Sequence, residues 1–398
     1  MKSPCDSRYG RMPTPEPLRA VRIGRVRDIA HLAWAEGEVI SLPAALLDRG
    51  PVAAALASDG TLEVSAALAP AVEGVADALR MRAAYTGAPV SGRLPVSYQR
   101  IPPVMRQLMA GAVGRLQRHR SAAWARYPRF PLDLTVDAVA DLAAAAATDG
   151  VPPRETAAAA TPVVLSHDLD SPEGLQNLVS MFLPVEESVG ARSTSFIVPC
   201  AWPVDHGLLA EVQARGHEIG IHGYDHANRT PHLPAEERRT RLAAAGELIA
   251  QYGCRGYRAP SLVRTSALLD DLAPLYRYDS SIPTSGGLFP TPNNGCATAR
   301  PFRIGRLLEI PLSMPRDGSL RFLGYSPRAI LDLWKATAQR IARSRGVVVL
   351  LTHCEARFSG NRAMLGAYEH FLRYLAETPE FRFVTAAGLA AEFNDGHG

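Results

Sequence analysis

The chain has 398 residues, of which 47% are hydrophobic and 21% are charged, and this composition is globular rather than disordered or fibrous. A length near 400 residues favours two domains, since roughly 100–200 residues per domain is usual. The formal net charge of +4 is too small for the concentrated basic face that binding many phosphates requires, so we expect no nucleic-acid partner.

Cysteine usage and hydropathy indicate a location inside the cell. The cysteines are scattered, form no CxxC pair and are typical of reduced thiols. The first residues carry charges and prolines without the apolar stretch of a secretory signal, and no segment reaches the roughly 18 apolar residues of a membrane span. We therefore expect a cytoplasmic protein, with any membrane contact peripheral to the inner face.

Changes in composition divide the chain into four parts. Residues 1–18 hold several prolines without a periodic apolar pattern, which predicts a flexible leader. Residues 19–147 are expected to form a smaller accessory domain, mixed and mostly helical. Residues 148–161 begin with the sequence TDGVPP and are interpreted as a linker. Residues 162–398 form the predicted catalytic domain.

The accessory domain contains a basic segment, residues 98–129, in which arginines flank the amphipathic stretch VMRQLMAGAVGRLQ. This pattern predicts a basic helix. Its charged face could simply be solvated while the helix packs on the catalytic domain. Alternatively, it could contact an anionic head group or polymer at a membrane surface.

Beyond the linker, short apolar runs alternate with helical patterns. Runs such as 347–351 indicate buried strands, and stretches such as 327–342 indicate helices. This alternation predicts parallel βα units, in which active sites lie at the carboxyl ends of the strands. The residues that follow each apolar run are therefore the candidate site residues.

Two carboxylates follow the first of these strands. Asp168 and Asp170 are separated by one residue, so on an extended chain they point to the same side. Neighbouring acids need a cation or an arginine to offset their repulsion, and one can then bind a metal while the other takes a proton. Taken alone, the same residues could introduce a turn or a helix cap.

A histidine pair follows the strand predicted at residues 218–221. His222 and His226 are four positions apart, and on a helical turn this spacing places both imidazoles on one face, as in paired zinc ligation. With one carboxylate they would leave coordination positions for water and substrate, which is typical of a catalytic metal site. These residues favour a divalent-metal hydrolase.

Three further residues follow later strands of the same domain. Arg258, in the sequence RAP, could brace a turn or keep a carboxylate ionised by pairing with it. Asp279 follows a short apolar stretch and could belong to an ordinary turn. His353 stands where an apolar strand leaves the core, a position that suits a general acid.

The order of these motifs over about residues 162–393 resembles the polysaccharide deacetylase family, also called the NodB-homology domain or carbohydrate esterase family 4. The resemblance implies an α/β fold, a distorted (β/α) barrel of about seven strands, preceded by the smaller accessory domain. It also implies a mononuclear site that is most often filled by Zn²⁺. Asp168 would be the general base, and Asp170, His222 and His226 would be the metal ligands.

The same resemblance implies roles for the three later residues. Arg258 would orient Asp168, and His353 would protonate the leaving amine. Asp279 resembles the acid that tunes or positions that histidine.

Two departures from the family pattern bear on the substrate. Leu169 separates the two acids, as in an Asp-x-Asp subset of the family, and Ser280-Ser281 stands where polymer-acting members have a tryptophan. We therefore expect removal of an N-acetyl group from an amino sugar or glycoconjugate made in the cytoplasm, such as an envelope or exopolysaccharide precursor or a glycosylated metabolite. The alternatives are a deformylase of a lipid-linked amino sugar and a catalytically silent carbohydrate-binding module.

Overall fold

The computed structural model describes residues 130–147, 160–285 and 295–395, together with four short strands and scattered helical positions nearer the N-terminus. The chain separates into two compact units: residues 1–78 with 138–158, and residues 79–137 with 159–398.

The described part of the first unit contains a four-stranded antiparallel sheet in the order β3-β2-β1-β4. Its strands are β1 (Leu18–Val26), β2 (Ile29–Ala33), β3 (Val39–Pro43) and β4 (Thr61–Val64). The accessory domain was expected to be mixed and mostly helical, and this sheet is the strand part of it among the described residues. In β1 the stretch VRI alternates apolar and charged residues, which is the period of a strand.

Several expectations fall on parts of the chain that the structure does not describe. The leader up to β1, almost all of the basic segment 98–129 and nearly all of the linker 148–161 lie outside the described residues. Among the described residues, none of the helices is both long enough and apolar enough to cross a membrane.

The second unit is a distorted (β/α) barrel, as the sequence predicts. Seven strands run parallel in the order β12-β5-β6-β7-β8-β9-β11, with β10 antiparallel to β11 and β13 parallel to β5. The strands are β5 (Thr161–Leu169), β6 (Thr194–Ile197), β7 (Glu218–Ile221), β8 (Gly256–Tyr257), β9 (Tyr278–Asp279), β10 (Phe302–Ile304), β11 (Leu307–Glu309), β12 (Val348–His353) and β13 (Phe381–Phe383).

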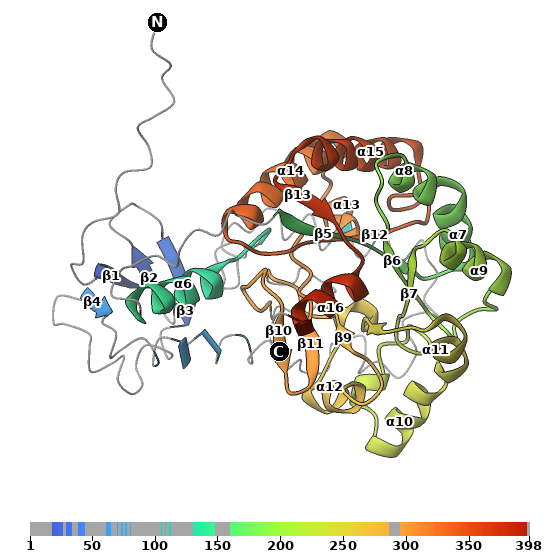
Figure 1. The fold of residues 1–398 in the computed structure, drawn as a ribbon, viewed down its shortest axis with the longest axis horizontal. Helices are drawn as coiled ribbons and strands as arrows, with labels where there is room; N and C mark the ends of the chain where they lie inside the picture. The colour runs from blue at the N-terminus through green and yellow to red at the C-terminus, as the bar shows by residue number, and fades with distance from the viewer. Residues whose placement is uncertain are drawn as a thin grey trace, which may run out of the picture. The chain divides into compact units, whose positions relative to one another are not determined.

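Helices connect these strands and surround the sheet (Figure 1). They are α7 (Pro172–Asn177), α8 (Leu183–Ser188), α9 (His206–Ala214), α10 (Ala235–Ala243), α11 (Gly246–Tyr252), α12 (Ser266–Leu272), α13 (Asp317–Phe322), α14 (Pro327–Arg343), α15 (Arg362–Glu377) and α16 (Ala386–Asp395), and α6 (Thr135–Ala147) precedes the barrel. Short turns of other helix types are η3 (Leu178–Phe182), η4 (Thr230–His232) and η5 (Pro260–Leu262). In α15 the buried side chains recur every three or four residues, from Met364 to Leu375, which is the stripe that packs a helix on a sheet.

The curled sheet is brought towards closure by the chain that follows β11. The Met314 N–H donates a hydrogen bond of 3.1 Å to the carbonyl of Val349 in β12. The Ser313 hydroxyl donates to the Val347 carbonyl at 2.6 Å and accepts the Val349 N–H at 2.8 Å. The segment after β11 therefore lies along β12, at the other end of the parallel series.

Side chains on β5 alternate between two hydrophobic clusters. Val163, Leu165 and Leu169 belong to the cluster that lies between the sheet and the helices, whereas Val164 belongs to the cluster inside the barrel. Because successive side chains of a strand point to opposite faces, even-numbered residues of β5 face the barrel interior. This alternation decides which polar residues of the strand can reach the site.

Candidate active site

Three side chains predicted as metal ligands converge at the carboxyl ends of the strands. Asp170 follows β5, and His222 and His226 follow β7. Asp170 Oδ1 lies 3.6 Å from His222 Nε2 and 3.4 Å from His226 Nε2. One ligand atom from each residue lies within 4.8 Å of the others, so the three side chains can hold one divalent ion.

The chemistry of these atoms fits a metal ion. Asp170 Oδ1 is buried and has no hydrogen-bond partner, so a cation would satisfy it. His222 Nδ1 lies 3.0 Å from the carbonyl oxygen of Arg258 and must donate to it, which leaves the Nε2 lone pair directed at Asp170. Burial lowers the pKa of His222, so its ring is neutral, as ligation requires.

A loop rather than a helical turn brings the two histidines together. Residues 222–229 contain no helix, and His226 has a left-handed backbone with φ of +57°. Gly223 has φ of +69°, and a Cβ there would lie 2.3 Å from Pro260 Cγ, so the loop packs too closely for any side chain. The structure thus places the two histidines side by side, but in a loop and not on the helical turn that their spacing predicted.

The predicted general base, Asp168, is held by Arg258. Arg258 Nη1 donates to Asp168 Oδ1 at 3.0 Å, while its other nitrogens donate to the carbonyl and hydroxyl of Ser280, each at 3.0 Å. The guanidinium also stacks 4.1 Å from the ring centroid of Phe196. Burial alone would raise the pKa of Asp168, but the charge that His222 carries in acid, where its ring is protonated, and the charge of Arg258 outweigh burial and lower it to about 2. Asp168 is therefore an ionised and oriented carboxylate.

The histidine at the end of β12, His353, is held by Asp317. His353 Nδ1 donates to Asp317 Oδ1 at 2.8 Å, and the His353 N–H donates to Asp317 Oδ2 at 2.8 Å. The Ser359 hydroxyl also donates to Asp317 Oδ2 at 2.8 Å, and the ring of Phe358 packs 4.7 Å from the imidazole. Burial would lower the pKa of His353, but the charge and hydrogen bond of Asp317 raise it to about 9. The imidazole is thus protonated at neutral pH.

Asp279 does not occupy the position that was expected for it. Its neighbours Tyr278 and Ser280 face the barrel interior, where Tyr278 packs in the inner cluster and Ser280 binds Arg258. Alternation along the strand therefore directs Asp279 to the opposite face, where it lies in register with Glu309. Burial raises the pKa of both carboxyls, and the charge of Asp279 raises the pKa of Glu309 further. Asp317, and not Asp279, positions His353.

The sequence contained a signal for Asp317 that motif order did not use. Asp317 follows the apolar stretch that continues from β11 beside β12, and it begins α13. It is thus an acid just after an apolar run, as Asp168 is. The acid expected to position the histidine was instead Asp279, which a shorter apolar run also precedes.

No family model matches the chain, and no curated protein matches it. Among solved structures, it is similar to a putative polysaccharide deacetylase from Mycobacterium smegmatis at 18% identity, over 62% of this chain and 94% of that one, with a TM-score of 0.48. A probable polysaccharide deacetylase from Pseudomonas aeruginosa PAO1 matches at 16% identity, 62% and 96% coverage, and a TM-score of 0.47. Puue allantoinase matches at 15% identity, with the same coverage and a TM-score of 0.49.

Proposed function

We propose that the chain is a Zn²⁺-dependent hydrolase that removes the N-acetyl group from an amino sugar or glycoconjugate made in the cytoplasm. The observation that carries the proposal is the arrangement around Asp168. On one side lie the three candidate ligands, with His222 Nε2 at 3.6 Å from Asp168 Oδ2. Next to it in register, on the neighbouring strand β12, is His353. Asp168, the proposed base, thus lies between the candidate metal ligands and the protonated imidazole of His353.

A divalent cation held by Asp170, His222 and His226 would polarise an amide carbonyl and make water acidic near neutral pH. The chain's own residues supply the proton transfers. Asp168 takes a proton from the attacking water, and its hydrogen bond to Arg258 keeps the carboxylate oriented towards it. His353 then delivers a proton from Nε2 to the departing nitrogen, because its Nδ1 is occupied by Asp317.

The protonated histidine favours an amide over an ester substrate. An amine is a poor leaving group unless its nitrogen is protonated as the bond to carbon breaks, whereas an alcohol needs less assistance. The carboxylate of Asp317 holds His353 in the protonated form that this step requires. A sugar bearing an acylated amino group is therefore a better fit than an O-acetylated sugar.

Metal content and turnover test the ligand assignment together. The Asp170→Ala and His222→Ala variants should lose both bound zinc and acetate release, whereas His370→Ala, an exposed histidine on α15, should keep both. Substrates should be N-acetyl amino sugars that are free, nucleotide-linked or lipid-linked, with the released acid identified by mass as acetate or formate. A purified protein that binds no stoichiometric zinc after supplementation, and releases no acid from the panel, would refute the proposal and favour the binding module.

A further inference from the structure

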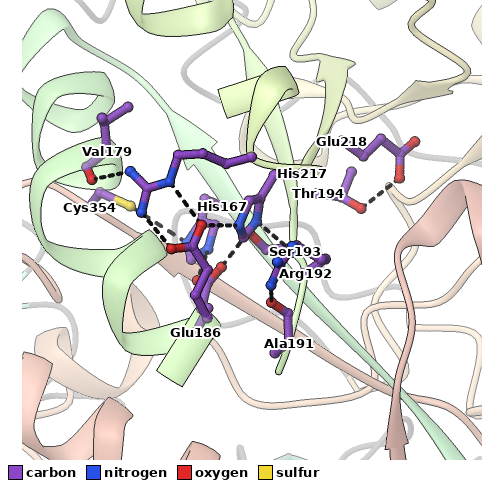
Figure 2. Close-up of polar contacts among 12 residues, drawn as sticks. His167, Val179, Glu186, Ala191, Arg192, Ser193, Thr194, His217, Glu218 and Cys354 are labelled. Atoms are coloured by element: carbon purple, nitrogen blue, oxygen red, sulfur yellow. Dashed lines mark hydrogen bonds and ion pairs between the residues drawn. The ribbon is translucent and has the colours of Figure 1, made fainter. Parts of the chain in front are cut away.

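Behind the catalytic strands lies a buried polar network that takes no part in the chemistry (Figure 2). At its centre, His167 Nε2 donates to Glu186 Oε1 at 2.7 Å, and both side chains are fully buried. Glu186 stands on α8, and its Oε1 also accepts the hydroxyl of Tyr368 on α15 at 2.8 Å. Polar groups that are buried so deeply are retained where their geometry is used, because leaving one unpaired is costly.

The network reaches both strands that carry the base and the acid. His167 immediately precedes Asp168 on β5, and its Nδ1 lies 2.9 Å from the hydroxyl of Thr352, which immediately precedes His353 on β12. The two strands pair in parallel with Thr352 opposite His167 and His353 opposite Asp168. The hydrogen bond on the outer face thus joins the residues directly beside the base and the acid.

The hydrogen bond between His167 and Thr352 matters because it can fix the register of β12 against β5. A slip of one residue would turn every side chain of a strand to the other face, and a slip of two would move His353 along Asp168 by about 7 Å. Backbone ladders alone tolerate such shifts better than a specific side-chain contact does. The imidazole of His167, fixed by Glu186, is such a contact.

We infer that Glu186, acting through His167 and Thr352, is a positioning residue that fixes β12 against β5 and thereby sets the separation of Asp168 and His353. The inference rests on the proposed function for the roles of those two residues. Burial alone would raise the pKa of Glu186, but His167 and the hydrogen bonds around the carboxylate lower it. The carboxylate is therefore ionised and holds His167 with a charged acceptor, which gives a shorter and stronger hydrogen bond.

A pair of neighbouring acids supplies a matched control. Glu187 is next in sequence to Glu186 but pairs with Arg215 at 2.8 and 2.9 Å, and its side chain is 29% exposed. It reaches Glu186 only through His217, whose Nε2 lies 3.3 Å from Glu187 Oε1 and whose Nδ1 lies 3.5 Å from Glu186 Oε2. Glu186→Gln and Glu187→Gln make the same chemical change, and only the first touches His167. Thr352→Val provides a second test, because it removes the hydrogen bond between Thr352 and His167 while keeping the side-chain shape, and it leaves only the longer contact of His167 Nδ1 with Cys354 Sγ, at 3.5 Å.

The experiment measures kcat, KM, zinc affinity and amide hydrogen exchange in zinc-loaded protein. Glu186→Gln and Thr352→Val should each lower kcat about 10- to 100-fold, with KM and zinc affinity within about two-fold of the parent. Amides of residues 348–353 should exchange faster in both variants. Glu187→Gln should change none of these quantities.

Two results would contradict the inference about Glu186. If Glu186→Gln and Thr352→Val lower only the unfolding midpoint, while kcat and exchange in β12 stay at parental values, the network is structural and the inference is wrong. It is also wrong if zinc affinity falls in step with kcat, because the whole site has then been disturbed. Should the parent protein show no turnover, the proposed function fails, yet the exchange measurement still decides whether the network fixes β12. If Glu186→Gln does not fold, Thr352→Val gives the same decision.

Discussion

Two histidine–carboxylate pairs lie on opposite faces of the same two strands, β5 and β12. His353 binds Asp317 at 2.8 Å on the inner face, and His167 binds Glu186 at 2.7 Å on the outer face. The first imidazole is 14% exposed and keeps Nε2 available, whereas the second is fully buried and uses both ring nitrogens. The same chemical pair can therefore donate a proton in one setting and only hold structure in the other, and access to the second nitrogen decides which.

The largest effect should come from removing the accessible histidine. His353→Ala should lower kcat about 10²- to 10⁴-fold, since that is the usual contribution of a general acid. Zinc content should be unchanged, because His353 is not one of the three candidate ligands. Steady-state kinetics with metal analysis measure both quantities. A variant that lost its zinc would show instead that His353 supports the metal site.

The comparison also predicts that removing the carboxylate of each pair lowers the free energy of unfolding by a different amount. Glu186→Ala leaves His167 buried without its charged acceptor, and breaking a buried pair in this way costs about 3–5 kcal/mol. Asp317→Ala should cost less, because water can reach His353. Urea denaturation of both zinc-loaded variants gives the two free energies of unfolding. Equal losses of unfolding free energy would mean that the different exposure of His167 and His353 does not determine the cost of removing their carboxylates.

The pH dependence of activity should reflect the pKa of His353, which its pairing with Asp317 on the inner face sets. The pKa of His353 is raised to about 9, so kcat/KM should fall as pH rises through that value and the acid loses its proton. In Asp317→Asn the pKa should return towards about 6.5, which lowers kcat/KM about 30-fold at pH 8. Because the folded pKa is raised, the pair also stabilises the fold fully below about pH 6.5 and loses that contribution as pH approaches 9. A pH–rate profile that is unchanged by Asp317→Asn would contradict this assignment.

The sequence predicted the barrel and the clustering of the three candidate ligands because their signals are local. Apolar runs give parallel strands, and polar residues just after those runs meet at one edge of the sheet. Asp170 and His222 each follow a strand directly, and His226 comes four residues after His222, so their convergence could be predicted although the loop of His226, with its left-handed backbone, could not. That loop depends on close packing against Pro260, which no spacing rule contains.

The acid side of the site was harder because it depends on which face each residue occupies. His167 and Asp168 are neighbours in sequence, yet one lies in the core behind the sheet and the other in the site. Asp279 and Asp317 both follow apolar stretches, and they differ in the strand phase, that is, in which face of the sheet each side chain points to. For a strand of two residues such as β9, the sequence does not fix that phase.

The smallest effect should therefore come from the acid that motif order had selected. Asp279→Asn keeps the size of the side chain and its place beside Glu309, on the face away from His353. Because burial raises the pKa of that carboxyl and its side chain lies on the face away from His353, removing its charge should change kcat less than about three-fold and leave the pH–rate profile in place. Asp317→Asn, the same change at the acid that touches His353, is the matched comparison. A loss of activity with Asp279→Asn as large as that with Asp317→Asn would mean that the outer carboxyl pair is coupled to the acid across the sheet.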